Sequence, residues 1–117
     1  LLASSAASDV YKRQDSVIAF TSQLAHVVSS SYVKSPSLLK QAGFSAGSFK
    51  DLTRVAKLNE DMWTELFLMN RGPLVDEIEH IIARLTEYRD AIANNDAQRL
   101  HDLLKEGREL KELSNNS

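Results

Sequence analysis

Residues 73–95, which read PLVDEIEHIIARLTEYRDAIANN, contain the clearest structural signal in this sequence. Their apolar residues recur with the period of an amphipathic α-helix. This stripe consists of Leu74, Ile78, Ile81, Leu85, Tyr88 and Ile92. Pro73 suits the first position of a helix, and the pair Asn94–Asn95 is typical of a helix end. The stretch therefore predicts one long helix that follows a break at Gly72–Pro73.

Helices are also predicted on both sides of this stretch. After it, Asp96 can cap a last helix, whose leucines share one side. These leucines are Leu100, Leu103, Leu104, Leu110 and Leu113. Before it, Asn59 can cap a helix that runs to about Arg71, with Glu60 and Asp61 in its first turn.

The N-terminal half predicts helices separated by Pro and Gly. The first helix is expected at Ser16–Lys34, because its apolar residues have helical spacing and Pro36 stops it. The remaining predicted elements are a short helix at Ser37–Ala42 closed by Gly43, a loop at Gly43–Lys50, and a helix at Leu52–Leu58 capped by Asp51. The predicted class is all-α, a bundle of about five or six helices.

Composition narrows the classes of function. The 117 residues are 43% hydrophobic and 26% charged, which is ordinary for a soluble globular domain. The net charge of -2 gives no basic excess, so we expect no nucleic-acid partner. The absence of Cys excludes disulfides, thiolate zinc sites and Cys nucleophiles. No apolar run is long enough for a membrane span, so we expect no membrane partner and a cytoplasmic location.

The two ends of the chain are set apart from the predicted domain. Residues Leu1–Gln14 (LLASSAASDVYKRQ) show neither a signal-peptide pattern nor a clear helical or strand period. We interpret them as a foreign or disordered segment, with a frayed native terminus as the alternative. The domain itself is predicted at residues 15–113, and residues 114–117 form a polar tail that we expect to fray.

The first predicted helix is unusual, because residues 16–33 contain no charged side chain. Val17, Leu24 and Val28 share one face of this helix. The opposite face is small and polar, and consists of Ala19, Ser22, His26, Ser29 and Ser30. Solvated faces normally contain charges, so we expect this face to pack or to line a cleft. His26 is its only titratable group, and two interpretations remain open: a ligand-binding imidazole, or a buried His bonded to a backbone carbonyl.

Asp51, Thr53 and Arg54 form a second candidate group, at a predicted helix N-terminus after a glycine-containing stretch. Helix N-termini attract anions, and Arg can bind a carboxylate through two N–H groups. The alternative is an ordinary surface Arg paired with Asp51 or Glu60. The stretch GFSAGS is not a P-loop, because no strand precedes it and no Gly-Lys-Ser/Thr follows it.

Two other patterns favour structural roles. Glu77 and His80 have the Glu-x-x-His spacing of di-iron bundles, but Gln98 stands where a second copy before His101 would need Glu. We therefore expect no metal site. The residues Met62, Trp63, Phe67 and Met69 are typical of a core or an interface.

Two blocks of the chain resemble the C-terminal half of the prephenate dehydrogenase family. They are TSQLAHVVSS at residues 21–30 and FKDLTRVAKLNEDMWTELFLMNR at residues 49–71. The family has Ser-x-x-x-His, then a Gly-rich loop, Asp-x-Thr-Arg and Met-Trp, in this order and with this spacing. The resemblance covers Asp15 to about Glu112. It implies the helical C-terminal dimerisation domain of that family, which is similar to the C-terminal domain of 6-phosphogluconate dehydrogenase.

The resemblance also implies an activity for the full-length protein. That activity is oxidative decarboxylation of prephenate to 4-hydroxyphenylpyruvate, in tyrosine biosynthesis, with NAD or NADP bound by a Rossmann domain. This chain contains no G-x-G-x-x-G, so we expect it to lack the cofactor site and the catalytic residues, and to be inactive alone. It would contribute prephenate binding and a homodimer interface.

The resemblance assigns substrate-binding roles to eight residues. Arg54 would bind a carboxylate of prephenate, while His26, with Ser22 beside it, would hydrogen-bond the polar side chain of the substrate. The others are Gly47 near the ring, Asp51 in an ion network with Thr53 in the same motif, and Met62 and Trp63 reaching the partner subunit's site. The sequence departs from the family at Gln23 and Gln14, where many relatives have His.

A second class of function stays open at this stage. The chain could be a stand-alone helical interaction domain that binds a partner helix. The uncharged Ser/His face and Arg54 favour the substrate-binding domain, because a plain bundle needs neither.

Overall fold

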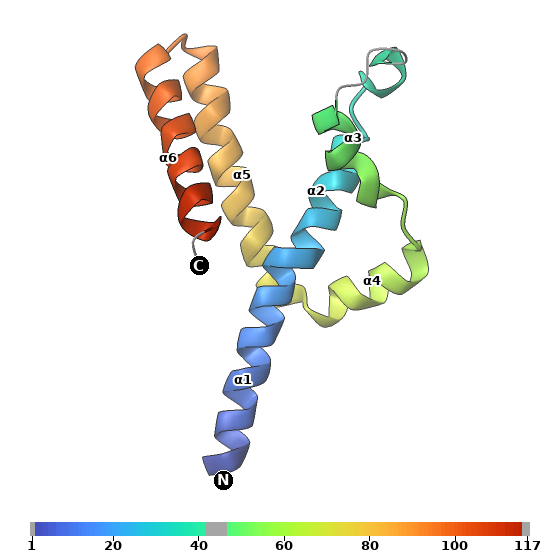
Figure 1. Cartoon of the computed structure of the whole chain (residues 1–117). Coiled ribbons are helices and arrows are strands. Elements are labelled where there is room, and N and C mark those ends of the chain that lie inside the picture. The colour runs from blue at the N-terminus through green and yellow to red at the C-terminus, as the bar shows by residue number, and fades with distance from the viewer. Residues whose placement is uncertain (1, 42–46, 116–117) are drawn as a thin grey trace. The chain divides into compact units, whose positions relative to one another are not determined.

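The computed structural model describes residues 2–41 and 47–115. The described residues are almost entirely helical and contain no strand, which confirms the predicted all-α class (Figure 1). The α-helices are α1 (Leu2–Ile18), α2 (Leu24–Tyr32), α3 (Gly47–Thr53), α4 (Glu60–Met69), α5 (Arg71–Ala93) and α6 (Ala97–Asn115). Three shorter turns join them: the π-helical turn η1 (Ala19–Gln23) and the 3₁₀ turns η2 (Leu38–Gln41) and η3 (Arg54–Ala56).

The chain divides into two compact units, residues 1–78 and 79–117. We call them unit 1 and unit 2 and describe each by itself. In unit 1, α1, η1 and α2 follow one another as a single helical run, in which the Leu24 N–H donates to the Ala19 carbonyl across the π-helical turn. α2 packs against α3 and η3. Among the side chains that the structure describes in unit 1, the buried ones are Ala19, Leu24 and Leu74, together with the polar Gln23, Ser29 and Asn70.

The start of the first helix was predicted wrongly. It begins at Leu2 rather than Ser16. The segment is rich in Ala, the best helix former, and residues 2–18 contain no Gly or Pro to interrupt it. The helix also ends earlier than expected, at Tyr32. Whether residues 1–14 belong to the native domain stays a prediction.

The small and polar face of this helix does pack, since Ala19 and Ser29 are buried. Val17, which shares the opposite face with Leu24 and Val28, is 58% exposed in the single chain, and Phe20 is 61% exposed. The π-helical turn explains part of this difference, because it changes the rotation per residue that a regular α-helix would have.

The region around α3 also differs from its prediction. Residues 47–50, expected in a loop, form the first part of α3, and Asp51 lies inside that helix instead of capping the next one. Packing of α3 on α2 outweighs the poor helix propensity of Gly47. The predicted short helix at Ser37–Ala42 is the 3₁₀ turn η2, and Gly43 lies outside the described residues.

The connections around α4 follow local chemistry. Asn59 caps α4 as predicted, because its Oδ1 accepts a hydrogen bond of 2.9 Å from the Met62 N–H. The break after α4 lies at Asn70, one residue before α5, and not at Gly72–Pro73. Pro73 is tolerated inside the first turn of α5, where a backbone N–H needs no intrahelical acceptor.

Unit 2 is a hairpin of two helical segments, the second half of α5 and all of α6 (Figure 1). The predicted signals at its turn are confirmed: α5 ends before Asn94–Asn95, and the Asp96 Oδ1 accepts from the Arg99 N–H at 3.0 Å. Asn95 adopts a positive φ of 52°, which Asn tolerates better than most residues. The Tyr88 hydroxyl donates to the Leu103 carbonyl at 3.1 Å, and Ala91 and Leu103 are buried.

α6 continues to Asn115, so the first half of the tail that we expected to fray is helical. Within the described residues, no helix is both long enough and apolar enough to span a membrane.

Candidate functional site

His26 lies half-buried on α2, with one ring nitrogen held by its own helix. Its Nδ1 is 2.8 Å from the Ser22 carbonyl oxygen. Because a carbonyl oxygen can only accept, Nδ1 is the donor in this contact, and Nε2 has no hydrogen bond among the described residues. The backbone bond fits the structural interpretation of this residue, but the ring is not sealed off from solvent.

Trp63 of α4 covers one face of this imidazole. The two ring centroids are 4.1 Å apart and the planes differ by 26°, so the rings are stacked. Phe67 also contacts the Trp63 indole, with ring centroids 5.5 Å apart and an angle of 51° between the planes. Stacked rings at these distances attract each other, which fixes the plane of the imidazole. We expected Trp63 to reach a partner subunit; in the single chain it stacks on its own His26.

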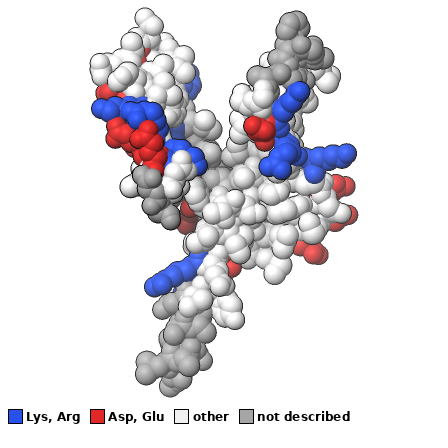
Figure 2. Space-filling model, viewed as in Figure 1, with Lys and Arg blue, Asp and Glu red and all other residues white. Residues whose placement is uncertain are grey.

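Arg54 begins η3, the 3₁₀ turn that packs against α2. Its side chain is exposed, and it has no ion pair among the described residues. Basic side chains gather over α3 and η3 in the space-filling view (Figure 2), where the sequence has Lys50, Arg54 and Lys57. An unpaired guanidinium on a basic surface can bind a carboxylate through two hydrogen bonds.

One expectation about Arg54 is wrong. It does not lie at a helix N-terminus, because α3 ends at Thr53 and Arg54 follows it. The positive end of a helix dipole therefore does not assist anion binding here. The alternative pairing of Arg54 with Asp51 or Glu60 is not present among the described residues either.

The other predicted site residues have simpler surroundings. The Thr53 hydroxyl donates to the Phe49 carbonyl at 2.8 Å, so it is used within α3. Asp51 is exposed on α3, without an ion pair among the described residues. A Cβ added at Gly47 would meet none of the described residues within 4 Å, so packing against that part of the chain does not require this glycine. Met62 is 50% exposed beside Trp63.

Two buried amides were missed by sequence reasoning. Gln23 and Asn70, both more than nine-tenths buried, are hydrogen-bonded to each other. Gln23 was noted only as a departure from the family, and Asn70 gave no signal except its place near a predicted helix end.

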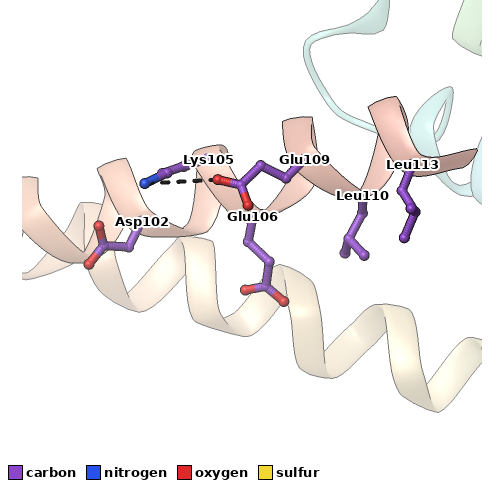
Figure 3. Close-up of a pocket in the computed structure, with 6 residues that line it drawn as sticks. All are labelled: Asp102, Lys105, Glu106, Glu109, Leu110 and Leu113. Carbon is purple, nitrogen blue, oxygen red and sulfur yellow. Dashed lines mark ion pairs between the residues drawn. The ribbon is translucent and has the colours of Figure 1, made fainter. Parts of the chain in front are cut away.

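Two surface hollows complete the description. One, of about 460 Å³, lies in unit 1 beside the Tyr32–Phe49 ring contact and is lined by Ser31, Tyr32, Ser35, Ser37, Leu38 and Phe49. The other, of about 610 Å³, lies along α6 (Figure 3), where Lys105 and Glu109 pair and Leu110 and Leu113 point to the same side of the helix. The second is an open and charged helix surface. No group of three or more His, Cys, Asp or Glu gathers in the described part of the chain.

Comparison with known proteins gives a consistent result. The family described as prephenate dehydrogenase, dimerization domain, matches residues 12–106. A cyclohexadienyl dehydrogenase of Zymomonas mobilis is 33% identical over 106 residues, which are 86% of this chain and 36% of that protein. A prephenate dehydrogenase of Lactococcus lactis is 30% identical over 108 residues, or 86% of this chain and 30% of that protein.

A solved structure supports the fold. The crystal structure of Synechocystis arogenate dehydrogenase matches with a TM-score of 0.75 at 20% identity, over 86% of this chain and 38% of that one. The chain thus spans about a third of the length of the curated relatives it matches.

Proposed function

This chain belongs to the prephenate dehydrogenase dimerization-domain family, and we propose that it is the substrate-binding and dimerisation part of a prephenate dehydrogenase. The proposed full-length enzyme converts prephenate to 4-hydroxyphenylpyruvate by oxidative decarboxylation, in the tyrosine pathway. A cytoplasmic location is part of this proposal.

The nucleotide of the proposed enzyme would be held outside this chain. NAD or NADP would supply the acceptor for the hydride that leaves the substrate ring. The residues present do not fit a dinucleotide: the sequence has no G-x-G-x-x-G, and the described residues contain no strand from which a βαβ unit could be built. In this proposal the chain supplies only substrate contacts.

One observation supports the substrate role above the others. α2, which contains His26, packs directly against η3, which begins with the exposed Arg54, a residue without an ion pair among the described residues. This arrangement puts a guanidinium and an oriented imidazole on neighbouring elements of unit 1. Prephenate has two carboxylates and further polar oxygens, so it requires a fixed cation and a hydrogen-bonding group near each other.

Each group has a distinct task in this proposal. Arg54 binds a carboxylate of prephenate. The Nε2 edge of His26 hydrogen-bonds the polar side chain of the substrate, because Nδ1 is already used on the Ser22 carbonyl. Trp63 holds the plane of the imidazole and shields one of its faces from water.

The remaining predicted contacts are part of the same proposal. Gly47 leaves open space for the substrate ring, Asp51 joins an ion network at the mouth of the site, and Thr53 stabilises the end of α3 just before Arg54. Exposed Met62 reaches toward the site of a second subunit in a homodimer.

The experiment compares three variants in the full-length protein that contains this chain. Arg54→Ala should cost about 1.5–3 kcal/mol of prephenate binding, which is roughly ten- to hundredfold in kcat/KM. Arg54→Lys should restore little, because one ammonium does not replace the planar fork of a guanidinium.

Arg108→Ala is the matched control, because Arg108 is exposed on α6 and already paired with Glu112 at 2.8 Å. Steady-state kinetics should show no change for that variant. An unchanged KM for prephenate in Arg54→Ala would remove Arg54 from the site.

A further inference from the structure

A chain of buried side-chain amides joins α1, η1 and α4 in unit 1. The Asn70 Nδ2 donates to the Gln23 Oε1 at 2.7 Å and to the Asp15 carbonyl at 2.9 Å. The Gln23 Nε2 donates to the Leu66 carbonyl at 3.2 Å. Gln23 and Asn70 retain only 5% and 8% of their exposure. We call these two residues the amide clamp.

The direction of the amide clamp is fixed by the backbone. The carbonyls of Asp15 and Leu66 can only accept, so each must face an amide nitrogen. If the Oδ1 and Nδ2 of Asn70 exchanged places, the oxygen would face two acceptors, the Gln23 Oε1 and the Asp15 carbonyl. The same exchange in the Gln23 amide would place its oxygen against the Leu66 carbonyl. Only the observed orientation therefore bonds both backbone carbonyls, and in it the Asn70 Oδ1 is buried without a hydrogen-bond partner among the described residues.

The amide clamp and the ring stack join the same two helical segments. His26 lies about one turn beyond Gln23, and Leu66 lies about one turn beyond Trp63. A slip of α4 by one residue would rotate its side chains by about 100° and shift them by about 1.5 Å. Such a slip would break the bond to the Leu66 carbonyl and would take Trp63 off the imidazole. The two contacts thus require the same register.

Apolar residues of similar size could fill this space without fixing that register. Buried amides are costly when unpaired, so they favour the one arrangement in which their partners are present. A single buried polar pair is a known means of selecting register between packed helices. Gln23 is the last residue of the π-helical turn, so the clamp bonds this turn to α4.

We propose that Gln23 and Asn70 are positioning residues, which set the register of α4 on η1 and α2 and so hold Trp63 flat on His26 with the Nε2 edge free. They touch no ligand in this role. The effect on prephenate rests on the proposed function of His26, whereas the effect on the ring stack does not.

The first experiment measures the stack itself in the 117-residue chain. Trp63 is the only Trp, so NOE cross-peaks between its indole protons and the His26 ring protons report the stack without ambiguity. Gln23→Leu should lose these cross-peaks. The double variant Gln23→Leu/Asn70→Leu should lose them too while folding better than the single one, because removing both amides leaves no side-chain amide of the clamp unpaired.

Thr21→Val is the matched control. Thr21 lies in the same π-helical turn, and its hydroxyl donates to the Val17 carbonyl at 2.8 Å. The substitution removes this bond, which joins two residues of the same helical run. In this variant the NOE cross-peaks between Trp63 and His26 should remain. Cross-peaks that persist in the folded double variant would overturn the proposal.

A measurement on the unaltered chain covers the case in which no clamp variant folds. On warming, the side-chain amide protons of Gln23 and Asn70 should lose protection from exchange together with the loss of the Trp63–His26 cross-peaks. Loss of amide protection well before any loss of the stack would contradict the proposal.

Kinetics of the full-length double variant separate the two claims. A raised KM for prephenate together with lost cross-peaks supports both. Lost cross-peaks with an unchanged KM support the positioning role and remove His26 from the substrate site.

Discussion

The two units of this chain use their polar groups in different ways. Unit 2 pairs its charges along the helix surface, as in Arg84–Glu87, Lys105–Glu109 and Arg108–Glu112. In the described part of unit 1 no ion pair occurs. Unit 1 instead buries two hydrogen-bonded amides, stacks an imidazole on an indole and leaves Arg54 unpaired.

This difference separates a solvated surface from a candidate site. Most side chains in these pairs of unit 2 are more than half exposed, so each pair contributes little to stability. In unit 1 the buried amides and the ring stack fix side-chain orientations, and Arg54 is exposed without an ion pair among the described residues. In the proposed function, a carboxylate of the substrate pairs with Arg54.

The largest expected effect is the absence of turnover by the isolated chain. The proposed substrate contacts in unit 1 would not oxidise prephenate without a nicotinamide, and the sequence has no dinucleotide fingerprint. A nicotinamide absorbance assay should show no prephenate oxidation, and calorimetric titration should show no binding of NAD or NADP. Clear turnover by the purified chain would show that the division between this chain and a cofactor domain is wrong.

The second expected effect is that the isolated chain forms a dimer, with twice the mass of one chain. Both units expose large apolar side chains that a second copy could cover. These include Ile18 and Phe20 in unit 1 and Leu85, Ile92, Leu104, Leu110 and Leu113 in unit 2. Light scattering with size exclusion should give twice the chain mass of 13.1 kDa. A folded and cooperative monomer at tens of micromolar would contradict the dimer.

The smallest expected effect concerns the paired charges of unit 2. Arg108→Ala removes an exposed pair at 2.8 Å and should change the free energy of unfolding by at most about 0.5 kcal/mol. Thermal unfolding at low and high salt measures this change, and high salt should reduce it further. A loss above about 1 kcal/mol would mean that the surface pairs of unit 2 stabilise the fold, which would contradict the difference between the two units.

Local signals in the sequence were enough for three helix boundaries: the start of α4, the end of α5 and the start of α6. Asn59 and Asp96 cap their helices as predicted, and Asn94–Asn95 ends α5, because each of these choices depends on a few neighbouring residues. The start of α3 was missed, since packing on α2 decides it. The π-helical turn was missed because a regular helical repeat was assumed through residues 19–23.

The candidate site was predicted residue by residue but not as an arrangement. The sequence pattern pointed to His26, Arg54 and Trp63 separately. The stack of His26 on Trp63 and the bond of Gln23 to Asn70 join positions far apart in the chain, so no local spacing could reveal them.

The central claim is that unit 1, and not unit 2, binds the substrate. The most direct test is titration of the isotope-labelled chain with prephenate, followed by nuclear magnetic resonance. We expect chemical-shift changes at the Arg54 guanidinium, the His26 ring and the Trp63 indole N–H, with α6 unaffected. Changes confined to α6, or none at millimolar prephenate, would contradict the claim.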